Sequence, residues 1–344
     1  MTAGPRGGQA GGFTDPEWAF TMFSLTTELL RAERSPDELL RSAVEAGLCT
    51  AIEADAPQHF RGYPWAGGQP DAQALAERCE FRALAEALGI RLTLLGIYND
   101  SALRRDRVMT PQESVDYIDG QLAAASAMGF EGARIAFGLA PEILAPLAER
   151  AEHHGVLLLQ EVQGGIRPDG ESFQRQLAAI DRIGSRQLGF VFDLSACMPA
   201  LPVSYLEALR QEGVPRCAVD YLEAEWHGST PQSLKAGLDA ALGDAQLTGA
   251  ARARLSMVFG RFGNTTVAEW REFLPLVRGV HLKYWDLEDR DGRVSGPIGE
   301  LRRELAAAGY AGAVTSEWGG HEWLDIDPIG MARGHRRLYD KSPT

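Results

Sequence analysis

An alternation of helix-like and strand-like segments runs along this sequence and limits the folds that it can adopt. The order of amphipathic segment, glycine, apolar run and polar loop recurs eight times if the two final strands are included. Glycine directly after a helix fits the left-handed C-cap conformation, which it adopts without steric cost. Alternating strands and helices indicate βαβ units and a parallel sheet. Eight strands with eight crossovers predict a (β/α)8 barrel, and a doubly wound sheet is the alternative.

The expected elements follow from these runs. Strands are predicted at 20–25, 50–53, 91–97, 133–137, 156–161, 188–193, 280–283 and 313–317. A helix is expected to start near Ser35, a plausible N-cap followed by proline, and others at 71–88, 110–128, 141–154 and 172–183. We expect one domain over 15–344, preceded by a disordered Gly- and Ala-rich tail at 1–14.

One spacing departs from the regular alternation. Between Asp193 and His281 lie roughly three times the residues that a loop, a helix and a loop need. This insertion, 195–278, has helix-like stretches near 203–211, 230–242 and 248–257, and we expect it above the carboxyl-terminal face of the barrel. A lid, a substrate-selecting cap and an oligomer contact all remain open as its role.

The charge and hydropathy of the chain exclude some partners. The formal net charge is −13, whereas a nucleic-acid-binding surface needs clustered Lys and Arg. No apolar stretch approaches the roughly 20 residues that cross a bilayer. The first residues also lack the apolar core of a signal peptide. We therefore expect a cytoplasmic protein that binds neither nucleic acid nor membrane.

Four apolar runs, the last four of the eight expected strands, hold a carboxylate or an imidazole at or near their end. These residues are Glu161, Asp193, His281 and Glu317. In a parallel barrel the carboxyl ends of the strands face one pocket, so the four side chains would converge. Each alone has an ordinary explanation, such as an ion pair or a buried hydrogen bond. Together, three carboxylates and one histidine predict a divalent metal site, which would polarise a carbonyl while a carboxylate takes the adjacent proton.

The segments 159–161, 191–194, 280–283 and 315–318 resemble the xylose isomerase-like barrel superfamily of sugar isomerases and epimerases. The resemblance extends from about residue 20 to the C-terminus, except for the insertion. It implies that Glu161, Asp193, His281 and Glu317 bind Mn²⁺ first, with Mg²⁺, Co²⁺ or Zn²⁺ as alternatives. It also implies that Glu161 and Glu317 transfer the proton. Lys283 matches the family's H-x-K and is expected to touch substrate or orient the site, unless it is a solvated strand-end lysine.

Two departures from that family alter the expectation. Many of its epimerases carry a histidine where this chain has Ala196, so a substrate contact of that subgroup is missing. The segments 281–286 (HLKYWD) and 316–321 (SEWGGH) are similar to the catalytic subunits of bacterial C-glycoside deglycosidases. That second resemblance implies cleavage of 3-oxo-glycosides by proton abstraction beside the ketone.

Aromatic and imidazole side chains follow several of the expected strands. Those predicted to contact a carbohydrate-like substrate are His59, Trp65, Trp285 and Trp318. Buried Trp in a barrel rim is an equally common explanation. His321 lies close after the strand-eight ligand and is predicted to act as an acid or base, because imidazole titrates near neutral pH. Glu53 remains either a further pocket residue or an internal ion-pair partner.

These features predict a metal-dependent sugar or keto-sugar isomerase or epimerase that works through an enediolate. The alternative is a lyase that cleaves 3-oxo-glycosides by elimination. A metal-dependent phosphodiesterase is disfavoured because it needs a multinuclear zinc cluster with many histidines. A non-catalytic sugar-binding barrel is disfavoured because all four ligands are present. The expected partners are a small carbohydrate-like substrate and either a second copy of the chain or an accessory subunit.

Overall fold

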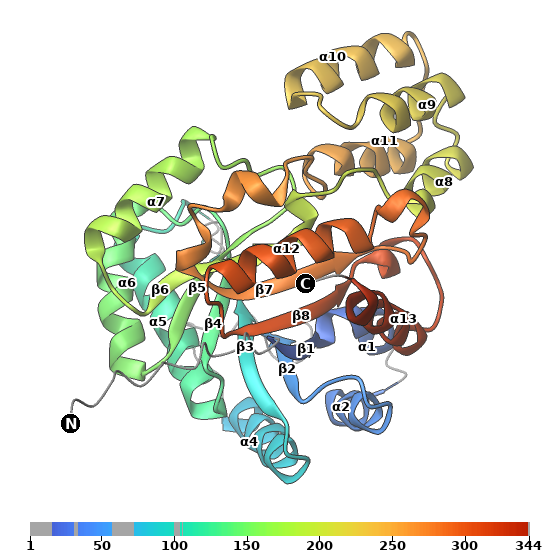
Figure 1. The fold of residues 1–344 in the computed structure, drawn as a ribbon. Coiled ribbons are helices and arrows are strands. Elements are labelled where there is room, and N and C mark those ends of the chain that lie inside the picture. The colour runs from blue at the N-terminus through green and yellow to red at the C-terminus, as the bar shows by residue number, and fades with distance from the viewer. Residues whose placement is uncertain (1–15, 31–33, 57–71, 100–103, 105, 343–344) are drawn as a thin grey trace, which may run out of the picture.

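The computed structural model describes residues 16–30, 34–56, 72–99, 104 and 106–342, and within them eight strands form a closed barrel (Figure 1). Neighbouring strands are parallel all the way round, and the pairing of β1 with β8 closes the ring. The strands are β1 (Glu17–Thr21), β2 (Ala51–Asp55), β3 (Arg91–Ile97), β4 (Gly132–Ala136), β5 (Leu157–Val162), β6 (Leu188–Asp193), β7 (Val277–Tyr284) and β8 (Ala313–Trp318). The predicted (β/α)8 barrel is confirmed, and the doubly wound sheet is ruled out.

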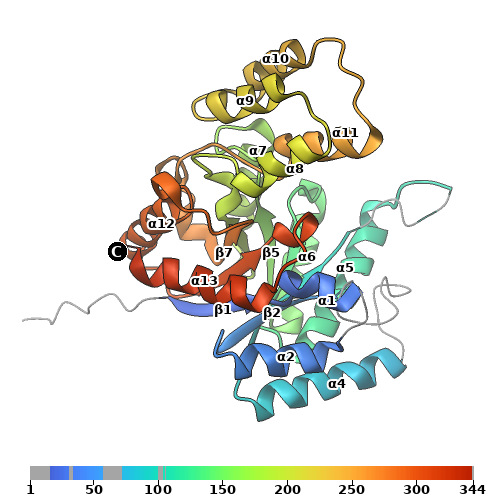
Figure 2. The same ribbon diagram turned by 90° about the vertical axis from the view of Figure 1, so that its right-hand side faces the viewer.

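Helices surround this barrel (Figures 1 and 2). They are α1 (Thr26–Leu30), α2 (Pro36–Glu45), α4 (Ala72–Ala87), α5 (Pro111–Met128), α6 (Pro141–His154), α7 (Glu171–Ile183), α12 (Ser295–Ala307) and α13 (Pro328–Lys341). Ser35 caps α2 as predicted, in a capping box with Glu38. Gly129 and Gly155 end α5 and α6 with φ values of 84° and 67°, a region that favours glycine. None of the described helices is long and apolar enough to cross a bilayer.

The first strand ends earlier than the apolar run 20–25 predicts. Strand β1 stops at Thr21, and Met22–Leu25 form a 3₁₀ helix, η1. The Thr21 hydroxyl oxygen accepts a hydrogen bond from the Phe23 amide at 3.2 Å, and the Thr26 hydroxyl donates to the Phe23 carbonyl at 2.5 Å. These local side-chain bonds favour a turn over continued strand pairing.

The inside of the barrel has an apolar floor. Leu94, Leu159 and Val191 pack together there from β3, β5 and β6. Side chains two residues apart in a strand point to the same face. Glu161 and Asp193, two residues beyond Leu159 and Val191, therefore lie on the inward face one layer closer to the carboxyl ends of the strands.

The insertion between β6 and β7 is a helical cap that stands apart from the ring of helices in both views (Figures 1 and 2). It contains α8 (Val203–Gln211), α9 (Arg216–Glu225), α10 (Pro231–Leu242) and α11 (Gly249–Ser256). Three of these match predicted helices, and α9 was not predicted. The cap has its own apolar core, which includes Tyr205, Trp226 and Phe262.

Polar contacts fix this cap to the loops that follow β7 and β8. The carboxylate of Asp286 accepts hydrogen bonds from the Ser204 amide at 2.8 Å and from its hydroxyl at 2.7 Å. Arg254 donates to the Glu322 carbonyl at 3.1 Å, and the Trp323 indole donates to Ser204 at 3.1 Å. The cap is thus anchored beside the carboxyl ends of the strands, as the sequence predicts.

Candidate metal centre

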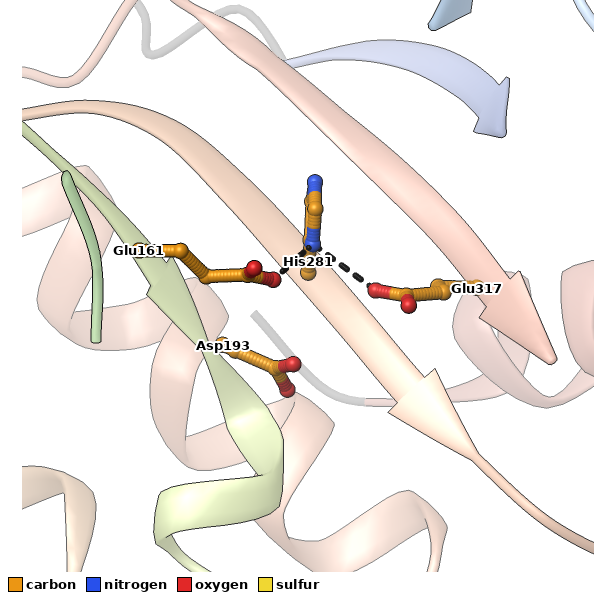
Figure 3. Close-up of side chains that lie close together, drawn as sticks. All are labelled: Glu161, Asp193, His281 and Glu317. Atoms are coloured by element: carbon orange, nitrogen blue, oxygen red, sulfur yellow. Dashed lines mark hydrogen bonds and ion pairs between the residues drawn. The ribbon is translucent and has the colours of Figure 1, made fainter. Parts of the chain in front are cut away.

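Four side chains from consecutive strands converge inside the carboxyl end of the barrel (Figure 3). One potential ligand atom from each residue lies within 4.8 Å of those of the others, and all four residues are buried. They are Glu161 on β5, Asp193 on β6, His281 on β7 and Glu317 on β8. The convergence predicted from the strand ends is therefore present.

The two carboxylate oxygens of Asp193 have different surroundings. Asp193 caps the short helix that follows β6, and its Oδ1 accepts a hydrogen bond from the Ser195 amide at 2.7 Å. Its other oxygen, Oδ2, is buried without a hydrogen-bond partner among the described residues, and its ion-pair partner Lys283 Nζ is 4.0 Å away. A buried carboxylate oxygen without a hydrogen bond is costly unless a cation satisfies it.

The imidazole of His281 faces carboxylates on both sides of the ring. Its Nδ1 lies 2.8 Å from Oε1 of Glu161 and 2.7 Å from Oε2 of Glu317. Each nitrogen of an imidazole ring carries at most one hydrogen, so Nδ1 cannot donate a full hydrogen bond to both carboxylates. A metal ion bound by these atoms would instead satisfy all three at once.

The charge balance of the centre also fits a divalent cation. Glu53 and Asp55 lie beside the four ligands, so five buried carboxylates are gathered here, against the permanent cations Arg134 and Lys283. His281 adds at most one further positive charge. Oxygen ligands with one imidazole suit Mn²⁺, Mg²⁺ or Zn²⁺. The residues present therefore fit a divalent ion, and its identity is not fixed by them.

The pKa values of the ligands are displaced in different directions. Burial raises the pKa of Glu161, but the Arg134 guanidinium and the His281 ring outweigh burial and lower it to about 2. Burial is likewise outweighed at Glu317, where Lys283 and His281 hold the pKa well below its usual range. Burial raises the pKa of Asp193 to about 7. Both glutamates are thus weak proton acceptors.

Burial lowers the pKa of His281, but the carboxylates of Glu53, Glu317 and Glu161 outweigh burial and raise it well above its ordinary value. Lys283 is also buried, and its ammonium group lies 2.5 Å from Oε1 of Glu317. Burial lowers the pKa of Lys283 while Glu317 and Asp193 more than reverse this, so the side chain is a fixed cation. It is a pocket residue rather than a solvated strand-end lysine.

His321 lies at the edge of this centre. Its ring contacts Phe23 at 4.9 Å between centroids, and Phe23 in turn lies 5.0 Å from the Lys283 ammonium nitrogen. Nδ1 of His321 donates to the Trp318 carbonyl at 3.0 Å, because a carbonyl can only accept. Burial lowers the pKa of His321 to about 4, so the neutral ring presents a bare Nε2 at neutral pH.

The other predicted substrate contacts lie elsewhere or outside the described residues. His59 and Trp65 belong to the stretch 57–71, which is not described. Trp285 is fully buried and packs on Phe262 in the core of the cap. Trp318 is also buried, and its indole donates to the Trp285 carbonyl at 2.9 Å. The structure thus places Lys283 beside Glu317, places His321 one aromatic ring away across Phe23, and shows both tryptophans in packing positions.

Four neighbours of the centre, Arg134, Glu53, Asp55 and Phe23, were not assigned to it from the sequence. Arg134 on β4 bonds Glu53, Asp55 and Glu161, and Glu53 also bonds His281. Glu53 was left open between pocket residue and ion-pair partner. Arg134 could have been found from its position, since an arginine inside an apolar barrel strand needs carboxylates around it. Phe23 had no signal, because its run was predicted as a strand.

Comparison with known proteins gives one group of relatives. The chain is 30% identical over 339 residues to a C-glycoside deglycosidase alpha subunit of Arthrobacter globiformis, covering 94% of this chain and 89% of the relative. It is 27% identical over 337 residues to a 3′-dehydrocarminate deglycosidase alpha subunit of a Microbacterium species, covering 94% of both. No family model matches the chain.

A solved structure of a D-psicose 3-epimerase, obtained in the presence of D-fructose, is similar in fold. The TM-score is 0.54 at 12% sequence identity, over 94% of this chain and 97% of the epimerase. At this identity the likeness shows the fold alone, a (β/α)8 barrel. The identity of 30% over nearly the whole length is the stronger finding: the chain belongs to the family of C-glycoside deglycosidase alpha subunits.

Proposed function

We propose that this chain is the catalytic alpha subunit of a metal-dependent deglycosidase that cleaves 3-oxo-C-glycosides by elimination. The observation that carries the proposal is the combination of a buried four-ligand centre with 30% identity, over 94% of the chain, to a C-glycoside deglycosidase alpha subunit. This favours the lyase alternative over the isomerase or epimerase that was the first expectation.

The chemistry that we propose begins at the carbon beside the ketone. In a 3-oxo sugar the C2–H bond is acidified, and C1 carries the aglycone in the β position. When bound by Glu161, Asp193, His281 and Glu317, a divalent ion supplies Lewis-acid polarisation of the ketone. Loss of the C2 proton then lets the electron pair form a C1–C2 double bond as the C1–aglycone bond breaks. The departing aglycone carbon takes up a proton, so no oxidant or reductant is consumed.

We assign the removal of the C2 proton to His321. Its Nδ1 donates to the Trp318 carbonyl, so in the neutral ring Nε2 carries no hydrogen and can accept a proton. Glu161 and Glu317 are the alternative bases, but Arg134, Lys283 and His281 hold the pKa of both carboxylates low. A group that is bonded by several cations takes up a proton poorly. The two glutamates then act as ligands.

Lys283 has a separate role in this proposal. Its buried ammonium group lies beside Glu317 and near the unsatisfied oxygen of Asp193. A fixed positive charge at this place stabilises negative charge that develops on the sugar ketone as the proton leaves. The same charge keeps Glu317 ionised and able to bind the ion.

We also propose that the chain works with a second subunit. Both relatives named above are alpha subunits, a name that implies at least one other chain. A partner subunit is therefore favoured over a second copy of the chain as the accessory component. The test is to compare the size and activity of the chain purified alone with those of the chain isolated from its source cells. A larger particle that contains a second protein supports the proposal, and a particle made only of copies of this chain contradicts it.

Epimerisation of a free ketose remains a second candidate, favoured by the shared barrel and by the same first proton transfer. The residue at position 196, an alanine, makes epimerisation of a free ketose less favoured. The residue is fully buried in the turn after β6, and its carbonyl accepts from the Thr265 hydroxyl at 2.6 Å. The methyl side chain of Ala196 cannot make the substrate contact that a histidine makes at this position in many epimerases.

One experiment separates these functions. The Mn²⁺-loaded protein is incubated in D₂O with a 3-oxo aryl C-glucoside, with the parent C-glucoside and with ketoses. We expect deuterium exchange at C2 and release of the aglycone only from the 3-oxo compound. The Asp193→Asn variant, which lacks one ligand charge, is expected to lose both. Epimerisation of a ketose without action on the 3-oxo compound would overturn the proposal.

A further inference from the structure

Beside the four ligands lies a second buried group of charges, formed by Arg134, Glu53 and Asp55. Arg134, on β4, is 9% exposed and donates to three carboxylates. The bonds run from Nε to Glu53 Oε1 at 2.6 Å, from Nη1 to Glu161 Oε2 at 2.9 Å and from Nη2 to Asp55 Oδ2 at 3.4 Å. Arg134 thereby connects strands β2 and β5 across the inside of the barrel.

Glu53 completes the connection. Its Oε2 lies 2.8 Å from Nε2 of His281, while its Oε1 accepts from Arg134. Glu53 has no exposed surface. With Nε2–H donated to this carboxylate, the Nδ1 atom of the neutral ring keeps its lone pair and points at Glu161 and Glu317. The carboxylate thus selects the tautomer of His281 that can bind a metal ion.

The backbone also makes room for this group. Gly96 on β3 pairs in register with Asp55 on one side and Arg134 on the other. A Cβ atom at Gly96 would lie 2.5 Å from Oδ1 of Asp55 and 2.8 Å from Nη2 of Arg134. A Cβ atom does not approach other heavy atoms this closely, so a side chain at this position would displace the arginine or the aspartate. Glycine at position 96 therefore leaves the space that Asp55 and Arg134 occupy.

We propose that Glu53 and Arg134 are positioning residues of the metal centre. Glu53 sets the orientation and tautomer of His281, and Arg134 holds Glu53 and Glu161 in fixed relation to each other. Neither residue touches the ion or the substrate. The inference rests on the metal site of the proposed function and goes beyond it, because it assigns roles to two residues that are not ligands.

The test measures metal binding rather than turnover. Mn²⁺ is titrated calorimetrically into chelator-treated protein, and the visible absorption of the Co²⁺-loaded protein is recorded. Glu53→Met keeps the bulk of the side chain but removes the acceptor, and we expect Mn²⁺ to bind about 10- to 100-fold more weakly. Glu53→Gln keeps an acceptor oxygen for Nε2 and is expected to recover part of that loss. The Co²⁺ spectrum should change in Glu53→Met, because the ligand ring is no longer fixed.

The role of Arg134 is tested by the same two measurements, Mn²⁺ calorimetry and the Co²⁺ absorption spectrum. Arg134→Lys keeps the charge but replaces the planar fork of donors by a single nitrogen, which does not match the positions of the three carboxylates, so weaker Mn²⁺ binding is expected. Arg91 provides a matched control, since it also joins two carboxylates, those of Glu17 at the start of β1 and Glu131 just before β4, but at the exposed amino ends of the strands. Arg91→Lys should leave Mn²⁺ affinity and the Co²⁺ spectrum unchanged.

The outcomes distinguish this inference from the proposed function. If the unaltered protein binds none of Mn²⁺, Co²⁺ and Zn²⁺, both fail. If it binds Mn²⁺, and Glu53→Gln, Glu53→Met and Arg134→Lys bind it equally well with an unchanged Co²⁺ spectrum, the positioning roles are wrong while the proposed function stands. If Glu53→Met does not fold, the nearly isosteric Glu53→Gln decides the question. Weaker binding with an altered spectrum in this folded variant supports the roles, and unchanged binding refutes them.

Discussion

Nδ1 of His281 lies 2.7 Å from Oε2 of Glu317, on the neighbouring strand. The same nitrogen is 2.8 Å from Glu161 on the other side. Three ligand atoms from β5, β7 and β8 therefore already surround one point. Because the ring nitrogen cannot serve both carboxylates as a donor, the arrangement is best satisfied by a cation. The predictions below follow from this geometry.

Metal binding is predicted to weaken as pH falls. Asp193, with a pKa raised to about 7, and His281, with a pKa raised well above its ordinary value, both hold protons at about pH 6. An ion must displace these protons, so affinity increases as pH rises from about 5.5 to 7.5, and binding at about pH 6 releases protons. Calorimetry in two buffers of different ionisation enthalpy measures that release. An affinity independent of pH over this range would contradict the assignment.

The carboxyl group of Asp193 is predicted to make the stability of the chelator-treated protein depend on pH. Burial raises the folded-state pKa of Asp193 above its ordinary value of 3.8, so the folded state holds the proton more tightly. The contribution of this group to stability is then lost as pH rises from about 4 to about 7. Asp193→Asn removes that dependence. Urea unfolding at several pH values, with and without the substitution, shows whether it does.

His321→Gln is predicted to lower kcat by about 10²- to 10⁴-fold, the usual loss when a general base is removed. Mn²⁺ affinity should be unchanged, since His321 is not a ligand. His153, exposed near the end of α6, is the matched control, and His153→Gln should retain full activity. Full activity of His321→Gln would return the base role to Glu161 or Glu317.

Gly96→Ala is predicted to weaken Mn²⁺ binding although it adds a single methyl group. The new Cβ would collide with Asp55 and Arg134, which lie next to the ligand Glu161. Gly249, at the start of α11, has nothing within 4 Å of its Cβ position. Gly249→Ala should therefore leave metal binding as it is. Equal affinities of the two variants would show that the space at Gly96 is not needed.

The cap is predicted to depend on Trp285, although this residue lies just after β7. Its buried indole packs on Phe262 in the apolar core of the cap. Trp285→Ala should destabilise the protein by about 3–5 kcal/mol. Phe259→Ala, at a half-exposed aromatic residue of the same insertion, should change stability by less than about 0.5 kcal/mol. Urea unfolding and limited proteolysis compare the two.

The barrel and its ligands were predictable because their signals are local. Apolar runs, glycine C-caps and a charged residue at a strand end are all visible in a few consecutive residues, as for Glu161 and Glu317. Barrel closure then brings those strand ends together without further information. The strand order and the position of the insertion follow from the same alternation.

The residues that were missed depend on contacts between distant segments. Arg134 is part of an otherwise apolar strand. Its partners Glu53 and Asp55 precede it by 81 and 79 residues in the sequence. Trp285 was predicted to contact substrate, whereas its packing against the cap depends on how the insertion folds back. Phe23 was assigned to a strand, because the Thr21 hydroxyl bond that turns the chain is not visible as an apolar pattern.

The most direct test of the account is a Mn²⁺ titration of chelator-treated protein. The account predicts one ion bound per chain, with a rise in thermal stability on binding because the ion binds only the folded state. Asp193→Asn should weaken or abolish both effects, since it removes the charge behind the unsatisfied oxygen. Absence of Mn²⁺ binding, with no stabilisation by Co²⁺ or Zn²⁺, would contradict the metal centre and the chemistry built on it.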